Sequence, residues 1–327
     1  MHASTARAGL LVALALAAAG CGGSSKTSGP TGDDGGTHLL AFATDRATGD
    51  SLRLQVALLD LDQQGYRSVS NLNATGSDQE EPCISDDGGF VCFSSNRPGG
   101  KGGTDLYLYR RLEADVIAPA PLESSANESW PRFTYDSVRI AFVRDSTGNK
   151  RIRLFDGVGD TLLTLPGLAV TGPFDDDEPA PDLHGDRIAF QSNRSGATHV
   201  YVWNRAAGVA ALPALLGDSL DVDPALTADG RWLAFASNRS GGAGGYDIYL
   251  YDLVAGAYVR LPRLNTAGDE RHPSVSAGGQ LLFFQARPSP SQHWQIWSYD
   301  LSDSTLAPPP ALIATSGNDR QPYVRWQ

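Results

Sequence analysis

Acidic residues recur at one position of an internal repeat, and they are the side chains of this sequence best suited to chemistry. Prolines mark the repeat, and the acidic position lies three residues before each of them. Carboxylates gathered on one surface can bind a hard cation or attract a basic partner. The position is acidic in five of the six copies: Gln79, Glu128, Asp176, Asp221, Glu270 and Asp319.

Arginines form a matching series, shortly after the second predicted strand of each repeat. We expect both series to lie on one face of the molecule, as a belt of structural ion pairs or as a surface for a partner. Repetition favours the structural role, because each unit of a repeat protein needs the same internal contacts. Partly exposed ion pairs contribute about 1 kcal/mol or less each. The arginines are Arg46, Arg97, Arg144, Arg194, Arg239 and Arg287.

A few charged residues are not part of the repeated pattern, and they are better candidates for a specific contact with a partner. Asp177, Asp223 and His272 lie next to the repeated positions but have no counterpart in every copy. No EF-hand-like ligand spacing occurs, so we predict neither a metal site nor a cofactor, and a Ca²⁺ site remains an alternative. The functional hypothesis is a partner-binding rim with these members: Glu128, Asp176, Asp177, Asp221, Asp223, Glu270, His272, Asp319, Arg97, Arg194 and Arg239.

Catalytic motifs are absent from the sequence. It has no Gly-x-Ser-x-Gly, no His-Glu-x-x-His and no phosphate-binding glycine loop. The segment 217–221 resembles a nucleophile elbow only superficially. We therefore predict a protein without enzymatic activity. The histidines after the predicted signal peptide are scattered over different repeats: His38, His184, His199, His272 and His293.

Two cysteines lie in the two strands of one predicted hairpin. Counting outward from its turn places Cys83 directly opposite Cys92. Alanines stand at the equivalent positions of other repeats, which favours two small buried residues. A cross-strand disulfide is the alternative, because directly paired cysteines can satisfy the bridge distances with some strain.

The repeat itself has a period of 45 to 49 residues. Each copy contains a hairpin, a third aromatic-rich strand and a short fourth strand, and no sustained helical period occurs. Four-stranded units repeated radially are typical of a β-propeller. An aliphatic, a small and an aromatic residue recur beside the prolines, as in Leu40-Ala41-Phe42. The marking prolines are Pro82, Pro131, Pro179, Pro224, Pro273 and Pro322.

The two ends of the chain complete one repeat. The first copy has its second strand, at 38–44, but lacks a first strand, and residues 319–326 supply a copy of that strand. Pairing the two would close a ring and remove its exposed edges. The prediction is an all-β, six-bladed propeller over residues 38–327, closed by both terminal strands in blade one.

The repeats resemble a known family. The pattern Pro-x-x-Ser/Thr-x-Asp-Gly-x-x-Ile/Leu-Ala-Phe-x-Ser-Asn-Arg is similar to the WD40-like PD40 repeat of TolB-type propellers. Residues 95–103 and 237–245 match best, whereas blades three and six depart from the pattern at 143–145 and 285–287. The resemblance implies the fold and is compatible with several functions. Similar propellers include envelope adaptors, domains attached to peptidases, and lyases that act on uronic-acid sugars with metal-bound histidines.

The first 37 residues indicate export. Residues 1–20 combine Arg7 with an apolar run, which is typical of a signal peptide and too short to span a membrane. Ala18-Ala19-Gly20-Cys21 resembles a bacterial lipobox, which predicts a lipid on Cys21. Residues 21–37 read as a flexible Gly/Ser/Thr tether.

The predicted location is the bacterial cell envelope, on the outer membrane and facing the periplasm or the surface. The only predicted contact with the membrane is the lipid. A net charge of −11 argues against nucleic acid as a partner. The leading hypothesis is a monomeric, non-catalytic scaffold that binds envelope proteins. A propeller lyase or hydrolase of uronic-acid sugars, and a propeller that binds a small ligand or cation, are the alternatives.

Overall fold

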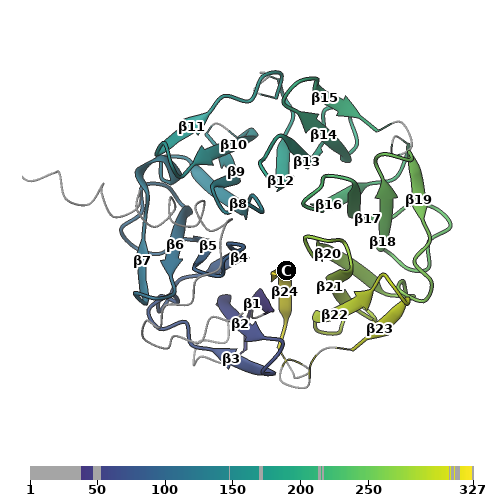
Figure 1. Ribbon diagram of the computed structural model, residues 1–327, viewed down its shortest axis with the longest axis horizontal. Helices are drawn as coiled ribbons and strands as arrows, with labels where there is room; N and C mark the ends of the chain where they lie inside the picture. Colours follow the sequence, from purple (N-terminus) through teal and green to yellow (C-terminus); the bar gives the residue numbers. More distant parts are fainter. Residues whose placement is uncertain are drawn as a thin grey trace, which may run out of the picture.

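The computed structural model is a closed ring of six four-stranded antiparallel sheets (Figure 1), as the repeat predicts. It describes residues 38–46, 53–146, 148–168, 172–212, 215, 217–308, 310, 313 and 317–325. The predicted signal peptide, Cys21 and the predicted tether lie outside this range. None of the described residues form a helix with the length and apolarity needed to cross a membrane.

Each blade contributes its first strand to the centre of the ring and its fourth strand to the outside (Figure 1). Blade one contains β24 (Asp319–Arg325), β1 (Leu39–Thr44), β2 (Gln55–Asp60) and β3 (Gly65–Arg67). Blade two contains β4 (Gln79–Ile84), β5 (Phe90–Ser95), β6 (Asp105–Arg110) and β7 (Asp115–Ile117). A short 3₁₀ helix (Ala120–Leu122) leads to blade three, which contains β8 (Asn127–Phe133), β9 (Arg139–Asp145), β10 (Lys150–Asp156) and β11 (Thr161–Leu163).

The other three blades follow the same order. Blade four contains β12 (Asp176–Pro181), β13 (Arg187–Ser192), β14 (His199–Asn204) and β15 (Gly208–Ala211). Blade five contains β16 (Asp221–Leu226), β17 (Trp232–Ser237), β18 (Asp247–Asp252) and β19 (Ala257–Val259). Blade six contains β20 (Asp269–Val275), β21 (Leu281–Arg287), β22 (Gln295–Asp300) and β23 (Thr305–Ala307).

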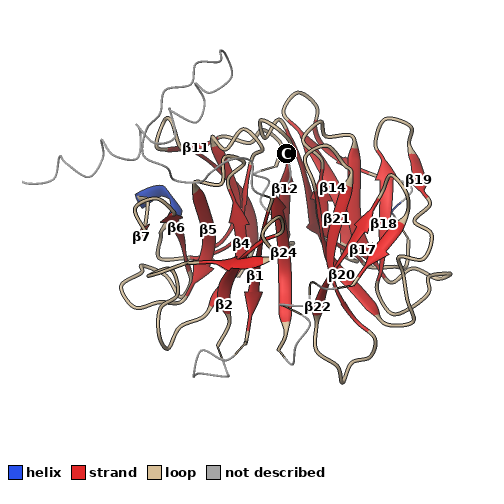
Figure 2. Ribbon diagram, turned by 60° about the horizontal axis from the view of Figure 1, so that its bottom comes forward, coloured by secondary structure: helices blue, strands red, loops and turns tan. Residues whose placement is uncertain are grey.

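Both terminal strands meet in blade one, which confirms the predicted closure. β24 pairs antiparallel with β1, from Leu39 opposite Arg325 to Thr44 opposite Asp319. Figure 2 shows the inner strands, β24 among them, running side by side along the axis of the ring. The ring therefore has no open end at this junction.

The apolar core lies between neighbouring blades. One cluster joins Leu154 of blade three to Phe190 of blade four, and equivalent clusters fill the other junctions of the ring. The repeated aromatic residue of the second strand is almost fully buried in every blade. These residues are Phe42, Phe93, Phe142, Phe190, Phe235 and Phe284. A single blade could not bury these faces alone, which is why the repeat has to form a ring.

The cysteine pair occupies the predicted positions. Cys83 lies directly opposite Cys92, as Ala180 lies opposite Ala189 in blade four. Both cysteines are buried and both are free thiols in the structure. Burial raises the pKa of Cys92, so this side chain behaves as a small apolar residue of the core.

Candidate functional site

The predicted acidic rim is a set of buried ion pairs. The carboxylate groups three residues before the prolines of blades three to six and one are fully shielded from solvent. Most of them accept a hydrogen bond from the arginine of their own blade, as Asp176 does from Arg194 (2.5 Å) and Asp221 from Arg239 (2.6 Å). Glu128 accepts from Arg144 (2.7 Å), and Asp319 from Arg46.

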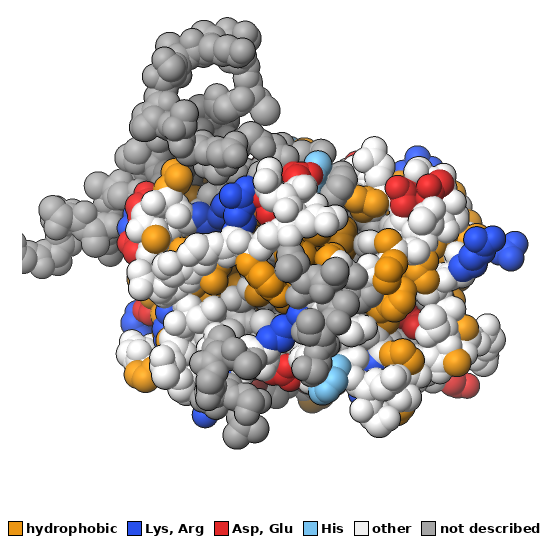
Figure 3. Space-filling view, turned by 90° about the horizontal axis from the view of Figure 1, so that it is seen from below, with side chains coloured by type: hydrophobic (Ala, Val, Ile, Leu, Met, Phe, Trp, Pro, Cys, Tyr) orange, Lys and Arg blue, Asp and Glu red, His pale blue; other side chains and the backbone are white. Residues whose placement is uncertain are grey.

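The arginines of these pairs are also packed against aromatic rings. The guanidinium of Arg239 lies 4.6 Å from the ring centre of Tyr249, and that of Arg194 lies 5.1 Å from the ring centre of Tyr201. A surface for a partner cannot be built on carboxylates that solvent does not reach. The rim hypothesis is thus corrected for Glu128, Asp176, Asp221, Glu270 and Asp319, in favour of the belt of structural ion pairs. In the view of Figure 3, acidic and basic side chains are interspersed and form no single large patch.

Glu270 differs from the other members of this belt. The repeated arginine of its blade, Arg287, pairs with Asp269 (2.8 Å), and Glu270 accepts hydrogen bonds from the hydroxyl (2.5 Å) and the backbone N–H (3.2 Å) of Thr266. Burial without a basic partner raises the pKa of Glu270 to about 7.

This shift predicts a pH-dependent stability. An acid whose pKa is higher in the folded protein than in the unfolded chain favours folding at low pH, and that contribution is lost as the pH rises through 7. We expect Glu270→Gln to gain stability relative to the wild type as the pH increases from 5 to 8. Urea unfolding at several pH values measures this, and parallel curves for the two proteins would contradict it.

A second ring of residues lies on the axis, directly before each repeated proline. All six have a left-handed backbone, with φ between 47° and 56°, and each lies at an irregularity in the pairing of its strand. Such a φ is unfavourable for bulky residues and persists only where the surroundings hold it. The six positions hold five residue types: Glu81, Trp130, Glu178, Asp223, His272 and Gln321. Sequence analysis identified only Asp223 and His272 among them.

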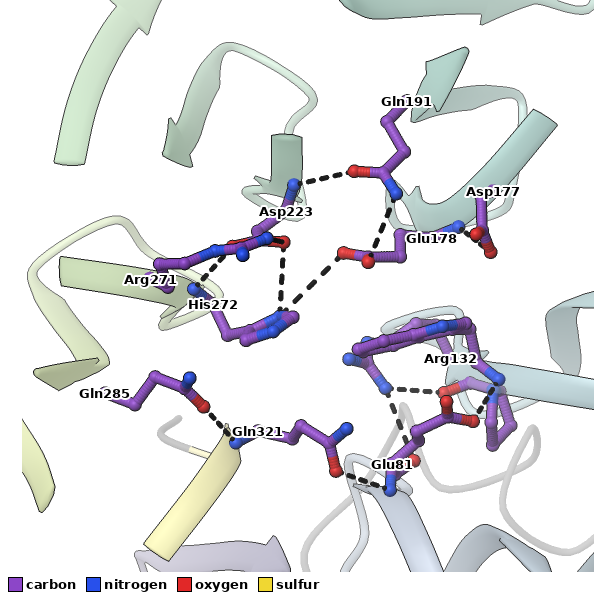
Figure 4. Close-up of polar contacts among 12 residues, drawn as sticks. Glu81, Arg132, Asp177, Glu178, Gln191, Asp223, Arg271, His272, Gln285 and Gln321 are labelled. Atoms are coloured by element: carbon purple, nitrogen blue, oxygen red, sulfur yellow. Dashed lines mark hydrogen bonds and ion pairs between the residues drawn. The ribbon is translucent and has the colours of Figure 1, made fainter. Parts of the chain in front are cut away.

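Half of these axial side chains have a structural task. Each strained residue exposes a backbone N–H, and a side chain of the preceding blade can accept its hydrogen bond. Gln321 accepts from the N–H of Glu81 (3.0 Å), Glu81 from that of Trp130 (2.6 Å), and Asp223 from that of His272 (3.1 Å). These bonds tie neighbouring blades together around the channel (Figure 4).

The side chains of Trp130, Glu178 and His272 do not accept the N–H bond of the next blade, because other residues accept it instead. We call these three the released side chains. The N–H of Glu178 bonds to Asp177 (3.0 Å), that of Asp223 to Gln191 (3.1 Å), and that of Gln321 to Gln285 (2.8 Å). Gln191 and Gln285 follow the repeated aromatic residue of blades four and six. The other blades have Ala43, Ser94, Val143 and Ala236 there. This deviation from the repeat is a signal in the sequence that the sequence analysis did not use.

The released side chains meet near Asp223. The His272 Nδ1 atom lies 3.4 Å from Asp223 Oδ1 and 3.8 Å from Glu178 Oε2. The ring of Trp130 stacks on His272 with centroids 5.2 Å apart, and Arg271 forms a two-pronged ion pair with Asp223 (2.8 Å for both bonds). In Figure 4, Glu178, Asp223 and His272 point toward one another from three successive blades.

Burial sets the charge states in this group. It lowers the pKa of His272 to about 4, which leaves a neutral imidazole at pH 7. Burial, with the nearby charges of Asp223 and Asp177, raises the pKa of Glu178. For Asp223, burial is outweighed by His272 and Arg271, which bring the pKa down to about 2. Perturbed groups that converge in this way are typical of binding and catalytic sites.

One end of the channel is closed. Tyr135, from the hairpin of blade three, donates from its hydroxyl to the carbonyl oxygens of Leu226 (2.8 Å) and Val275 (3.2 Å) in blades five and six. A pocket between Tyr135 and the axial ring is lined by Glu178, Asp223 and His272, together with Arg132 and Tyr323. Beyond the ring, Lys150 pairs with Asp177 (2.6 Å) and is partly exposed. The site is therefore a blind channel with charged residues on the side away from Tyr135.

No protein-family model matches the sequence, and no curated protein matches it either. Solved structures do match. TolB from Acinetobacter baumannii superposes with a TM-score of 0.67 at 18% identity, covering 90% of this chain and 68% of the other. A putative TolB from Agrobacterium tumefaciens gives 0.57 at 16%, covering 89% and 98%. An oligogalacturonate lyase in complex with manganese gives 0.56 at 12%, covering 78% and 70%.

Prolyl endopeptidases share the propeller as well, with a TM-score of 0.54 at 11% identity over 84% of this chain and 48% of theirs. Fold similarity at this level does not indicate a function, because proteins with unrelated activities share one fold. The chain is an all-β, six-bladed propeller, structurally similar to TolB propeller domains at low sequence identity.

Proposed function

We propose that this protein is a non-catalytic binding propeller of the bacterial cell envelope, lipid-anchored through Cys21, and that it binds an envelope protein at the open end of its channel. One observation carries the proposal. Six equivalent positions converge on the axis, and they hold six side chains that differ in charge, size and hydrogen bonding. Three of them bond neighbouring blades, whereas Trp130, Glu178 and His272 do not, and such differences at equivalent positions suit a site for one asymmetric partner.

The charged surroundings suit a polar segment of a partner. Lys150 pairs with Asp177 on the side of the axial ring away from Tyr135, and Trp130, whose ring contacts His272 and Arg132, is partly exposed. Aromatic anchors in a half-closed site commonly dominate the energy of binding. The proposed contact is thus an inserted side chain or chain end that packs against the aromatic ring of Trp130.

Site-specific photocrosslinking tests this proposal. A photoreactive amino acid replaces Lys150, whose side chain is 39% exposed, and in a control it replaces Leu112, which is 80% exposed on blade two. We expect one defined envelope protein to be captured from position 150 in the native envelope, and the yield to fall at least 10-fold with Trp130→Ala. Equal capture from both positions, or none from position 150, would reject the proposal.

A lyase or hydrolase of uronic-acid sugars is the second candidate. It is favoured by the neutral His272 beside Glu178 and Asp223, with Arg132 lining the same pocket, since imidazole and carboxylate groups can act as acid and base and arginine binds sugar carboxylates. The oligogalacturonate lyase found among the similar structures makes oligogalacturonate the first substrate to test. Turnover that is lost in Glu178→Gln would favour this candidate over the binding propeller.

A further inference from the structure

The most specific cluster on the axis consists of Glu178, Asp223 and His272. Within the described part of the chain, these three offer one ligand atom each, and the three atoms lie within 4.8 Å of one another. We propose that they bind one divalent transition-metal ion, such as Zn²⁺ or Mn²⁺, in the channel. This site does not depend on the proposed envelope partner.

The distances suit an ion of this class. Ligand atoms at about 2.1 Å from a tetrahedral ion lie about 3.4 Å apart. The structure has His272 Nδ1 at 3.4 Å from Asp223 Oδ1 and at 3.8 Å from Glu178 Oε2. The three ligand atoms lie within 4.8 Å of one another, so closer approach of the two carboxylates would complete the triangle. The positions not filled by protein remain for water or a ligand.

The surroundings fix the ligands, as a metal site requires. Gln191 donates to Glu178 Oε1 (3.2 Å) and accepts from the N–H of Asp223, so one side chain orients two of the ligands. This leaves Glu178 Oε2 directed toward His272. Arg271 holds Asp223 through both carboxylate oxygens, and Oδ2 also accepts from the N–H of His272. Oδ1, the oxygen next to His272 Nδ1, retains a lone pair for an ion.

The pattern of released side chains is an independent observation that points to the same residues. Glu178 and His272 are the axial residues whose own blades carry a glutamine, Gln191 or Gln285, that accepts the next backbone N–H in their place. The blade therefore closes without their side chains. Both side chains are partly exposed, at 11% and 16%, which leaves a path for an ion.

The donor set decides the class of ion. One imidazole nitrogen with two carboxylate oxygens suits Zn²⁺, Mn²⁺ or Fe²⁺, whereas Ca²⁺ and Mg²⁺ prefer oxygen ligands alone. The imidazole is neutral and can offer its nitrogen.

Metal binding to the full chain tests the inference. The protein is purified in detergent, stripped with EDTA, and dialysed against graded Zn²⁺ or Mn²⁺, and the bound metal is measured by mass spectrometry. We expect one ion per chain for the wild type. Glu178→Gln, which keeps the size of the side chain, and His272→Ala should each weaken binding at least 10-fold.

His184→Gln is the matched control, because His184 also places its Nδ1 near a carboxylate, Asp136 (2.8 Å), but on the exposed surface. Its affinity should equal that of the wild type. The metal should also raise the unfolding temperature of the wild type and not that of Glu178→Gln, which separates a lost site from a misfolded variant. No bound ion in the wild type, or equal binding in wild type and Glu178→Gln, would overturn the inference.

Discussion

Asp221→Asn is expected to lower the free energy of unfolding by about 3 kcal/mol. The carboxylate is fully buried, and it accepts hydrogen bonds from Arg239 (2.6 Å) and from the Nδ1 atom of His199 (3.1 Å). Arg239 is itself packed against Phe235 and Tyr249. Loss of the negative charge leaves the buried guanidinium of Arg239 without its counter-ion. The free energy lost in this way is larger than the net free energy that the ion pair contributes to stability. Urea unfolding at pH 7, followed by circular dichroism, measures the difference.

An exposed ion pair in the neighbouring blade provides the control. Asp186 pairs with Arg205, and the two side chains are 57% and 41% exposed. Asp186→Asn should change the free energy of unfolding by less than about 1 kcal/mol. Equal effects of the two substitutions would show that the buried belt is not what stabilises the blades.

Removal of residues 319–327 is expected to have an even larger effect, because it takes the closing strand out of the ring. Val324 is 4% exposed and packs in a cluster with Leu40, Phe42 and Phe283. The loss of this apolar contact and of the backbone hydrogen bonds between β24 and β1 should lower the free energy of unfolding by on the order of 5 kcal/mol or more. The edge of β1, whose side chains are all buried in the intact ring, would also be left unpaired. We therefore expect aggregation as well as a lower unfolding temperature, both measurable by light scattering during heating.

A peptide in trans provides the control for this truncation. A synthetic peptide of residues 317–327 should restore part of the lost stability, and a scrambled peptide of the same composition should not. If the shortened chain unfolds at the same urea concentration as the intact one, closure by β24 contributes nothing measurable.

The sequence alone determined the architecture. The proline period and the recurring aliphatic-small-aromatic triplet predicted six blades, and the missing first strand at one end with its copy at the other predicted the closure. The core residues followed too, because a strand places alternate side chains on one face and the triplet lies in the second strand of each blade. Even the facing positions of Cys83 and Cys92 could be counted from the turn between them. These features are local, and each is repeated, so every copy supports the others.

The tertiary structure alone decided where the unlike residues meet. Glu178, Asp223 and His272 belong to three blades, and only closure of the ring brings them to one axis. The sequence could not show that the residue before each proline has a left-handed backbone and faces the channel.

The same holds for the repeated acids. Their spacing predicted a common rim. Whether that rim is exposed depends on how arginine and aromatic side chains pack over the carboxylates, as Arg194 packs against Asp176 and the ring of Tyr201. What is repeated along the chain could be predicted, because it follows from the geometry of one blade. The role of residues that differ at equivalent positions depends on which of them lie close together, and only the closed ring brings them together.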